Sequence, residues 1–253
     1  SLSEAYELCQ QRSSLVVGGM VWLKMTSVTK RTIVDLSGLG LDKIEETKEE
    51  FRIGAMCTLR QLETDQGLNQ YFGGIFKECT RHIVGVQMRN LATVGGSIYS
   101  RFGFSDILTC LMALDTYVEL YHGGMVPLEE FAKRPVRRDD RDILVRIIIK
   151  KDGRKAAYTT QRNSETDFPV IACCVSRWGN DWYVAVGARP GRAQVVKIRD
   201  DGYDSLAQLA GEAADSFTYG SNTRASGQYR RQLAAVYTRR LMERLTGRSV
   251  SKG

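Results

Sequence analysis

ATVGG, residues 92–96, places two adjacent glycines in the middle of the chain, and LVVGGMVWLKM, residues 15–25, places another pair near its start. An apolar run comes before each pair, so we expect a buried element to end there in a tight corner. Glycine has no Cβ, so it adopts positive φ without a clash and lets backbone N–H groups approach an anion closely. The pairs therefore predict either two plain turns or two corners that face each other across a ligand.

Neither corner matches an established nucleotide-binding motif. The G-x-G-x-x-G of Rossmann sites is absent from both, and neither continues into the Lys-Ser/Thr of a Walker loop. One corner alone would hold a diphosphate weakly, because the field at an exposed helix end contributes only about 0.3–1 kcal/mol per charge. Backbone amides from both corners are therefore needed for a diphosphate clamp.

The bulk composition is that of an ordinary globular protein. The chain has 253 residues, of which 43% are hydrophobic and 26% are charged, which favours one large domain or two modest ones. No apolar run approaches the roughly 20 residues that span a bilayer, and the first residues resemble a helix more than a secretory signal. We therefore expect no membrane span and a cytoplasmic protein.

The cysteines and the charge pattern exclude further classes of site. The six cysteines show no C-x-x-C pair and no spacing suited to zinc or iron–sulfur ligation, so we expect buried thiols and no metal site on this chain. The net charge of +7 comes partly from residues 133–155, where ten basic residues accompany four acidic ones. No aromatic residue interleaves this charge, so we expect a solvated loop followed by a strand, without nucleic-acid binding. A contact with an acidic partner is the alternative.

Hydrophobic periodicity predicts a mixture of helices and strands. Capping patterns indicate helix starts at Ser1, Thr58 and Ser105. A helical turn after the first glycine pair is expected to point Val21 and Trp22 inward. Further helices are predicted over the second half of 71–83 and over 205–217 and 225–245, and strands near 15–17, 32–36, 43–47, 49–55 and 116–120, with a hairpin over 168–188. The last helix is expected to bury Leu233, Val236, Tyr237, Leu241 and Leu245, and to expose Arg230, Arg231, Arg239, Arg240 and Arg244.

The central stretch resembles a known family. Residues 85–115 are similar to the FAD-binding subunit or domain of the molybdenum hydroxylases, which include xanthine dehydrogenases and carbon monoxide dehydrogenase. Their sequence is GVQMRNLATVGGSIYSRFGFSDILTCLMALD, and the resemblance extends to LVVGGMVWLKM upstream and to RIGAMCTLRQLE between the two. Its most specific part is Q-x-R-N-x-A-T-x-G-G, from Gln87 to Gly96, followed by Asp106. The resemblance implies an α+β fold, with a two-lobed FAD-binding domain of the p-cresol methylhydroxylase type over residues 1–150 and a smaller α+β domain with a hairpin sheet and helices over 151–253.

The resemblance also implies a set of cofactor-binding residues, because in that family the two corners hold the FAD diphosphate and ribityl chain. Gly18 and Gly19 would supply backbone N–H groups and Thr93 a hydroxyl donor. Asp106 would contact the cofactor, or alternatively serve only as a first-turn helix residue. The implied set is Leu15, Val16, Val17, Gly18, Gly19, Met20, Val21, Trp22, Ile83, Thr93, Val94, Gly95, Gly96, Ser97, Asp106 and Leu144, of which Ile83 and Leu144 are equally good core residues.

The chain departs from the family pattern at several positions. Met20 stands where Thr or Ser is frequent, and Ser97 where Asn is frequent. Thr159 or Thr160 takes the place of a lysine that some relatives carry near the flavin. Arg162 could substitute for that lysine, although an exposed arginine at a strand end is the simpler interpretation.

The implied function is electron transfer. FAD on this chain would receive electrons from [2Fe–2S] clusters on a small partner subunit, after hydroxylation at a molybdopterin centre on a large one, and would pass them to NAD, a quinone, ferredoxin or oxygen. No catalytic residue and no metal ligand is expected on this chain. Two alternatives stay open: a stand-alone flavoprotein oxidoreductase, and a flavin-free scaffolding subunit.

Overall fold

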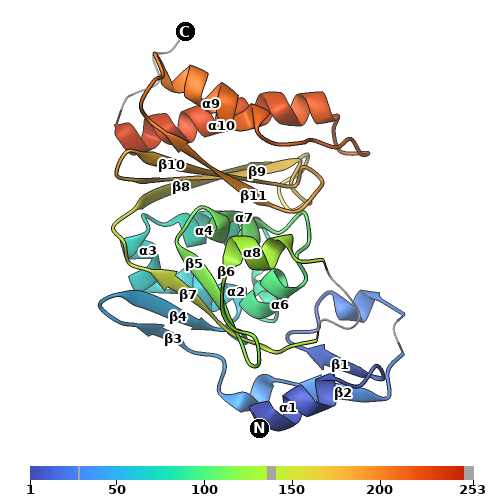
Figure 1. Ribbon diagram of the computed structural model, residues 1–253. Helices are drawn as coiled ribbons and strands as arrows, with labels where there is room; N and C mark the ends of the chain where they lie inside the picture. Colours follow the sequence, from blue (N-terminus) through green and yellow to red (C-terminus); the bar gives the residue numbers. More distant parts are fainter. Residues whose placement is uncertain (28, 136–140, 248–253) are drawn as a thin grey trace.

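The computed structural model describes residues 1–27, 29–135 and 141–247, which form three parts stacked along the length of the molecule (Figure 1). The first lobe holds the helix α1 (Leu2–Cys9) and the parallel strands β1 (Ser14–Val17) and β2 (Thr32–Asp35). Two short 3-10 helices, η1 (Leu23–Met25) and η2 (Ser37–Leu39), follow these strands. A small core that includes Ala5, Cys9 and Val34 joins α1 to the strand pair.

The second lobe is built on a five-stranded antiparallel sheet of order β3-β4-β7-β5-β6. Its strands are β3 (Ile44–Glu46), β4 (Glu50–Gly54), β5 (Thr116–Leu120), β6 (Gly124–Pro127) and β7 (Leu144–Lys150). Its helices are α2 (Leu59–Thr64), α3 (Gln66–Tyr71), α4 (Ile75–Thr80), α5 (Val86–Arg89), α6 (Val94–Tyr99), α7 (Asp106–Met112) and α8 (Leu128–Lys133). The strand predicted to follow the loop of the basic stretch is β7, and residues 136–140 of that stretch lie outside the described residues.

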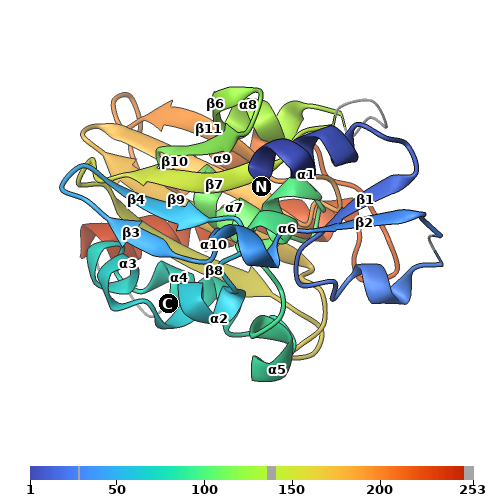
Figure 2. The same cartoon turned by 90° about the horizontal axis from the view of Figure 1, so that it is seen from below.

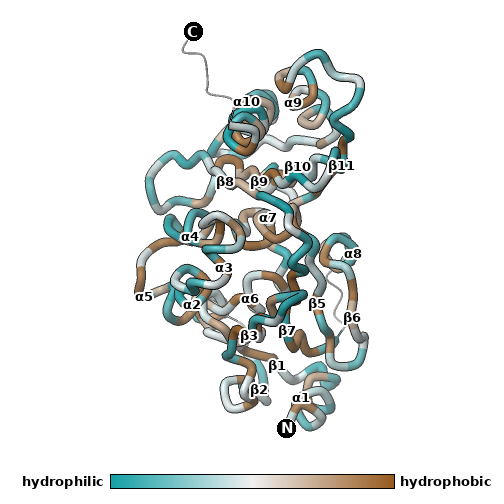
Figure 3. Tube along the Cα trace, turned by 90° about the vertical axis from the view of Figure 1, so that its left-hand side faces the viewer, coloured by the Kyte–Doolittle hydropathy of each residue, from teal (hydrophilic) through white to brown (hydrophobic). Residues whose placement is uncertain are grey.

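The C-terminal unit is a four-stranded antiparallel sheet of order β11-β10-β9-β8, covered on one face by two helices (Figure 3). Its strands are β8 (Lys155–Gln161), β9 (Ile171–Trp178), β10 (Asp181–Gly187) and β11 (Gln194–Arg199), and its helices are α9 (Leu206–Asp215) and α10 (Gly227–Thr246). The sheet is buried on both faces. Val175 and Val184 pack under α9 and α10, while Tyr158 and Cys174 join the main core of the second lobe.

The boundary expected between residues 150 and 151 falls between β7 and β8, in the connection from one sheet to the next. A single core cluster nevertheless takes side chains from both sides of it, including Phe76 and Leu108 on one side and Tyr158 on the other. The division into two domains therefore stays a prediction.

The local start signals predicted from the sequence are present. Ser1 and Thr58 begin α1 and α2 in complete capping boxes, and the Ser105 hydroxyl accepts a hydrogen bond from Leu108 N at the start of α7. These caps satisfy amides that have no partner within the helix. The hairpin turn at Gly179 and Asn180 is also confirmed, since β9 and β10 pair on either side of it.

Helix α7 is buried on all sides, and the sequence-based prediction of which α10 residues face inward is wrong at two positions. All seven residues of α7 are buried, because the helix lies between α4 and the β9–β10 face of the C-terminal sheet. On α10 the predicted inward Val236 is 37% exposed, whereas the predicted outward Arg230 is 1% exposed. The pattern failed there because the first turn of α10 packs against the loop that follows β10.

Among the described residues, no helix combines the length and the apolarity needed to cross a bilayer. The same residues contain no group of three or more His, Cys, Asp or Glu side chains arranged to hold a metal ion. All six cysteines are buried as free thiols, as the sequence predicted.

Candidate functional site

The two glycine corners lie directly against each other. A Cβ on Gly19 would stand 1.6 Å from the Leu91 carbonyl oxygen, and a Cβ on Gly18 would stand 2.7 Å from Thr93 Oγ1. Both distances are far inside ordinary van der Waals contact. Figure 2 shows the elements that carry the corners, β1 and α6, next to one another. The fold therefore joins segments that are more than seventy residues apart, at a point where only glycine fits.

The glycines are required for close approach and not for a left-handed backbone. Gly18, Gly19, Gly95 and Gly96 all lie outside the positive-φ region, so the prediction that they turn the chain through positive φ is wrong. The left-handed residue of the first corner is instead Met20, whose φ is +57°. An L residue with a side chain is strained in this conformation.

The second corner is the start of a helix, and its amides are already used. Thr93 is the N-cap of α6, and its Oγ1 accepts a hydrogen bond from Gly96 N at 3.1 Å. The N–H groups of Val94 and Gly95 donate to the carbonyl oxygens of Cys57 and Ala55, each at 2.8 Å. The expectation that amides of both corners converge on one diphosphate is therefore wrong for this corner. Its available donor is the Thr93 hydroxyl, whose proton is not needed for the cap.

The first corner does offer free amides. Within the described residues, the N–H groups of Gly19, Met20 and Val21 donate to no backbone or side-chain acceptor. None of these three residues is sealed in the core, since Met20 is exposed and Gly19 and Val21 are partly exposed. Their amides are therefore open to water or to a ligand. Three successive free N–H groups beside the Thr93 hydroxyl form a donor surface suited to phosphate oxygens.

Asp106 lies in a buried network of its own. It is the first residue of α7 and is 4% exposed, and its carboxylate accepts a hydrogen bond from the Tyr158 hydroxyl at 2.6 Å. Its other oxygen pairs with Arg162 Nη2, also at 2.6 Å. The side chain of Arg162 is 7% exposed, so the prediction of an exposed strand-end arginine is wrong. In this structure the Asp106 carboxylate is therefore occupied by protein partners.

Burial dominates the electrostatics of this network. It raises the pKa of the Asp106 carboxyl above its ordinary value, and the Arg162 guanidinium and the Tyr158 hydroxyl offset part of that rise. Burial likewise raises the pKa of Tyr158 well above its usual range. His82 lies nearby, and burial followed by the charge of Arg81 lowers its pKa. The Arg162 guanidinium is thus held between the Asp106 carboxylate and the Asp167 carbonyl oxygen of the β8–β9 loop.

The remaining predicted site residues lie in the surrounding core. Leu15, Val16 and Val17 form β1, and Leu144 is buried at the start of β7 opposite Leu120. Ile83 is half-buried against the main core, and its carbonyl oxygen accepts a hydrogen bond from Arg89 Nη1. Their contact with a cofactor stays a prediction.

Sequence reasoning missed an aromatic cluster beside the first corner. Trp22 does not point inward as predicted. Its side chain is 40% exposed. The centroid of its ring lies 4.9 Å from the ring centroid of Phe102 and 5.4 Å from that of Phe104. Phe168, from the loop between β8 and β9, stands 4.2 Å from Phe104. The two phenylalanines of SRFGF, directly after the second corner, were the signal that could have revealed this cluster.

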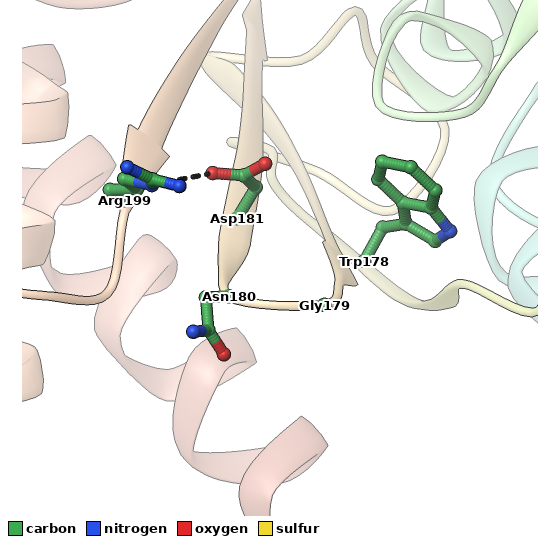
Figure 4. A pocket seen from close by; sticks show the side chains of 5 residues that line it. All are labelled: Trp178, Gly179, Asn180, Asp181 and Arg199. Carbon is green, nitrogen blue, oxygen red and sulfur yellow. Dashed lines mark ion pairs between the residues drawn. The ribbon is translucent and has the colours of Figure 1, made fainter.

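A shallow hollow elsewhere on the surface involves none of these residues. It lies at the β9–β10 turn and is lined by Trp178, Gly179, Asn180, Asp181 and Arg199 (Figure 4). The Asp181 carboxylate is paired with Lys197 at 2.8 Å and faces Arg199 at 3.9 Å. Its charges thus compensate one another, so the hollow is an ordinary turn surface.

Known proteins are similar to this chain in sequence and in fold. A family model described as "FAD binding domain in molybdopterin dehydrogenase" matches residues 1–150. The protein YgfM of Escherichia coli K12 is 27% identical over 156 residues, which cover 62% of this chain and 57% of that protein, so the match spans little more than half of that relative. The glyceraldehyde dehydrogenase medium chain of Sulfolobus acidocaldarius is 24% identical over 238 residues, covering 85% of this chain and 83% of that one.

Solved structures share the fold. Quinoline 2-oxidoreductase from Pseudomonas putida 86 superposes with a TM-score of 0.82 at 21% identity, covering 98% of this chain and 95% of that one. Reconstituted CO dehydrogenase from Oligotropha carboxidovorans gives a TM-score of 0.84 at 21% identity, covering 98% and 96%. The predicted α+β fold is confirmed by this likeness.

Proposed function

Because this chain belongs to the family of FAD-binding domains in molybdopterin dehydrogenases, we propose that it binds FAD and serves as the flavin-carrying electron-transfer subunit of a molybdenum hydroxylase complex. The observation that carries the proposal is the direct contact between the Gly18–Gly19 corner and the Leu91–Thr93 segment. That contact creates a rim of free donors from two distant parts of the sequence.

The residues on this rim fit a diphosphate. The free N–H groups of Gly19, Met20 and Val21 can donate to phosphate oxygens, and the Thr93 hydroxyl can add a donor from the other corner. The diphosphate would then lie along the shared edge of the corners and not in a gap between them. The wider lining would be Leu15 to Trp22 and Thr93 to Ser97, with Ile83 and Leu144 packing nearby. Asp106 would hold Arg162 in place.

Bound FAD would supply two-electron and one-electron redox chemistry, which no side chain of this site provides. We expect the [2Fe–2S] clusters to lie on a small partner subunit and the molybdopterin centre on a large one, with NAD, a quinone, ferredoxin or oxygen as the acceptor. The relatives named as medium chains of multi-subunit enzymes support this division. The burial of all six cysteines on this chain agrees with clusters held elsewhere.

The first test is FAD binding by the purified chain and its Thr93→Val variant. The variant removes the hydroxyl donor and the α6 cap, which costs about 1 kcal/mol of stability. Ser205→Ala is the matched control, because it removes the N-cap of α9 without touching either corner. We expect both variants to lose similar thermal stability, and only Thr93→Val to lose FAD affinity, by about tenfold. Equal FAD affinity in wild type and Thr93→Val would count against the rim as the FAD site.

One observation favours the flavin-free scaffolding subunit as the second candidate. The second corner pairs its own amides, which leaves it fewer donors than the sequence implied. Stoichiometric FAD released on denaturation of the purified protein would exclude this candidate. Co-purification with molybdopterin-binding and iron–sulfur chains would separate an electron-transfer subunit from a stand-alone flavoprotein.

A further inference from the structure

Arg230 is a buried cation with neutral partners only. It lies in the N-terminal part of α10 and is 1% exposed. Its Nη1 donates to the Ala188 carbonyl oxygen at 3.0 Å and its Nη2 to Asn222 Oδ1, while its buried Nε has no hydrogen-bond partner among the described residues. Burying a charge without a counter-ion is costly. An anion is therefore the partner that this guanidinium lacks.

The surroundings of Arg230 add positive charge. Arg189, at the start of the loop after β10, is 5% exposed and donates to the carbonyl oxygens of Thr218 and Arg192, which are neutral. Arg224 pairs with Asp167 at 2.9 Å. Within the described residues, Arg224 and Arg230 thus have a single carboxylate between them, that of Asp167. The pKa of Arg230 is lowered by burial and then by the charge of Arg224, which is the expected response to an uncompensated cation.

A cavity opens beside these charges. It has a volume of about 80 Å³ and is lined by Arg230, Arg224, Phe104, Phe168 and Pro190, among others. This is several times the roughly 10–15 Å³ that one water molecule requires. Its aromatic and proline walls lower the local dielectric, which strengthens the attraction between the guanidinium groups and an anion. The N-terminal end of α10 further disfavours cations and favours anions.

We propose that this cavity binds a phosphate group between Arg230 and Arg224. Guanidinium groups bind phosphate oxygens through paired N–H donors. Arg224 and Arg230 together carry one positive charge more than the Asp167 carboxylate neutralises, which favours an anion at this cavity. The phosphate belongs either to a nucleotide or to free inorganic phosphate. The site consists of the β8–β9, β10–β11 and α9–α10 loops, the start of α10 and Phe104. It takes no residue from the glycine pairs, although Phe104 and Phe168 also contact Trp22.

The test is calorimetric titration of the full chain with inorganic phosphate. We expect binding to wild type, and at least tenfold weaker binding to Arg224→Ala and Arg230→Met. Arg231→Ala is the matched control, because Arg231 also lies on α10 but is exposed and paired with Asp215. Arg224→Ala alone decides the outcome if Arg230→Met does not fold, since Arg224 is only partly buried. Absence of binding at millimolar phosphate, or equal affinity in wild type and Arg224→Ala, would overturn the proposal.

A second titration separates this site from the FAD site and identifies the source of the phosphate. Saturating FAD should leave the phosphate affinity unchanged, whereas displacement of phosphate by FAD would show that phosphate binds at the corners and would refute a separate site. NADH that binds at least tenfold more tightly than phosphate, and loses that affinity in Arg224→Ala, would identify a nucleotide phosphate. Equal or weaker NADH binding, with phosphate binding still lost in Arg224→Ala, would identify free phosphate.

Discussion

Gly19→Ala should separate the two corners on which the proposed FAD site depends. The new methyl group would stand 1.6 Å from the Leu91 carbonyl oxygen and 2.5 Å from its carbon, and both atoms belong to the backbone. Reaching ordinary contact near 3.4 Å requires one corner to move by about 1.8 Å. Overpacking a tight contact costs typically about 1–3 kcal/mol, and we expect the upper end because no side chain can rotate away.

Two readouts measure this perturbation. A loss of about 3 kcal/mol lowers the melting temperature of a chain of this length by roughly 6–12 °C. Displacing the donors by this distance should remove at least one charge-assisted hydrogen bond to the diphosphate, worth about 1.5–3 kcal/mol, so FAD affinity followed by flavin fluorescence should fall about tenfold or more. Gly38→Ala is the control, since its methyl group would meet nothing within 4 Å.

The two readouts refute different parts of the reasoning. A Gly19→Ala variant with the melting temperature of wild type would contradict the contact between the corners. A variant with a lowered melting temperature but wild-type FAD affinity would leave the contact standing and would show that the cofactor binds elsewhere.

Three further predictions concern single residues. Asp106→Asn leaves Arg162 buried without its counter-ion. The free energy of unfolding measured in urea should therefore fall by about 3–5 kcal/mol. A fall of less than about 1 kcal/mol would mean that water already screens the pair. Met20→Gly relieves the left-handed conformation at φ +57° and should raise stability by about 0.5–1 kcal/mol in thermal unfolding, whereas a decrease would show that the Met20 side chain packs usefully. Hydrogen bonding to Lys150 lowers the pKa of the Glu50 carboxyl, so the ionised carboxylate stabilises the fold above its ordinary pKa of 4.5, and this stability is lost as the pH falls through the lowered pKa. The difference in unfolding free energy between wild type and Glu50→Gln should therefore shrink on acidification. A difference that stays constant with pH would contradict the pairing.

The sequence could predict the features that depend on neighbouring residues. Ser1, Thr58 and Ser105 cap their helices with amides only three residues away, so a short stretch of sequence contains both partners of each bond. The strands and the β9–β10 hairpin follow from alternation and turn residues in the same way. The family resemblance rested on Gln87 to Gly96, whose residues lie together in the chain.

The candidate site was only partly predictable. The sequence marked both glycine pairs, but it could not show that the amides of Val94 and Gly95 are used by Cys57 and Ala55, because those acceptors lie nearly forty residues away. Nor could it show that Arg162 reaches Asp106, since that pair joins the end of β8 to the start of α7.

By itself the sequence determined several helix starts and strands, the family, and the positions where a bare backbone is available. The tertiary structure alone decided which amides stay free, where the left-handed strain falls and which arginines are buried without a counter-ion. The physical reason is that hydrogen-bond satisfaction and desolvation depend on every atom that packs around a group. For Arg230 the deciding neighbours are Ala188, Asn222 and Arg224, and only the folded chain brings them together.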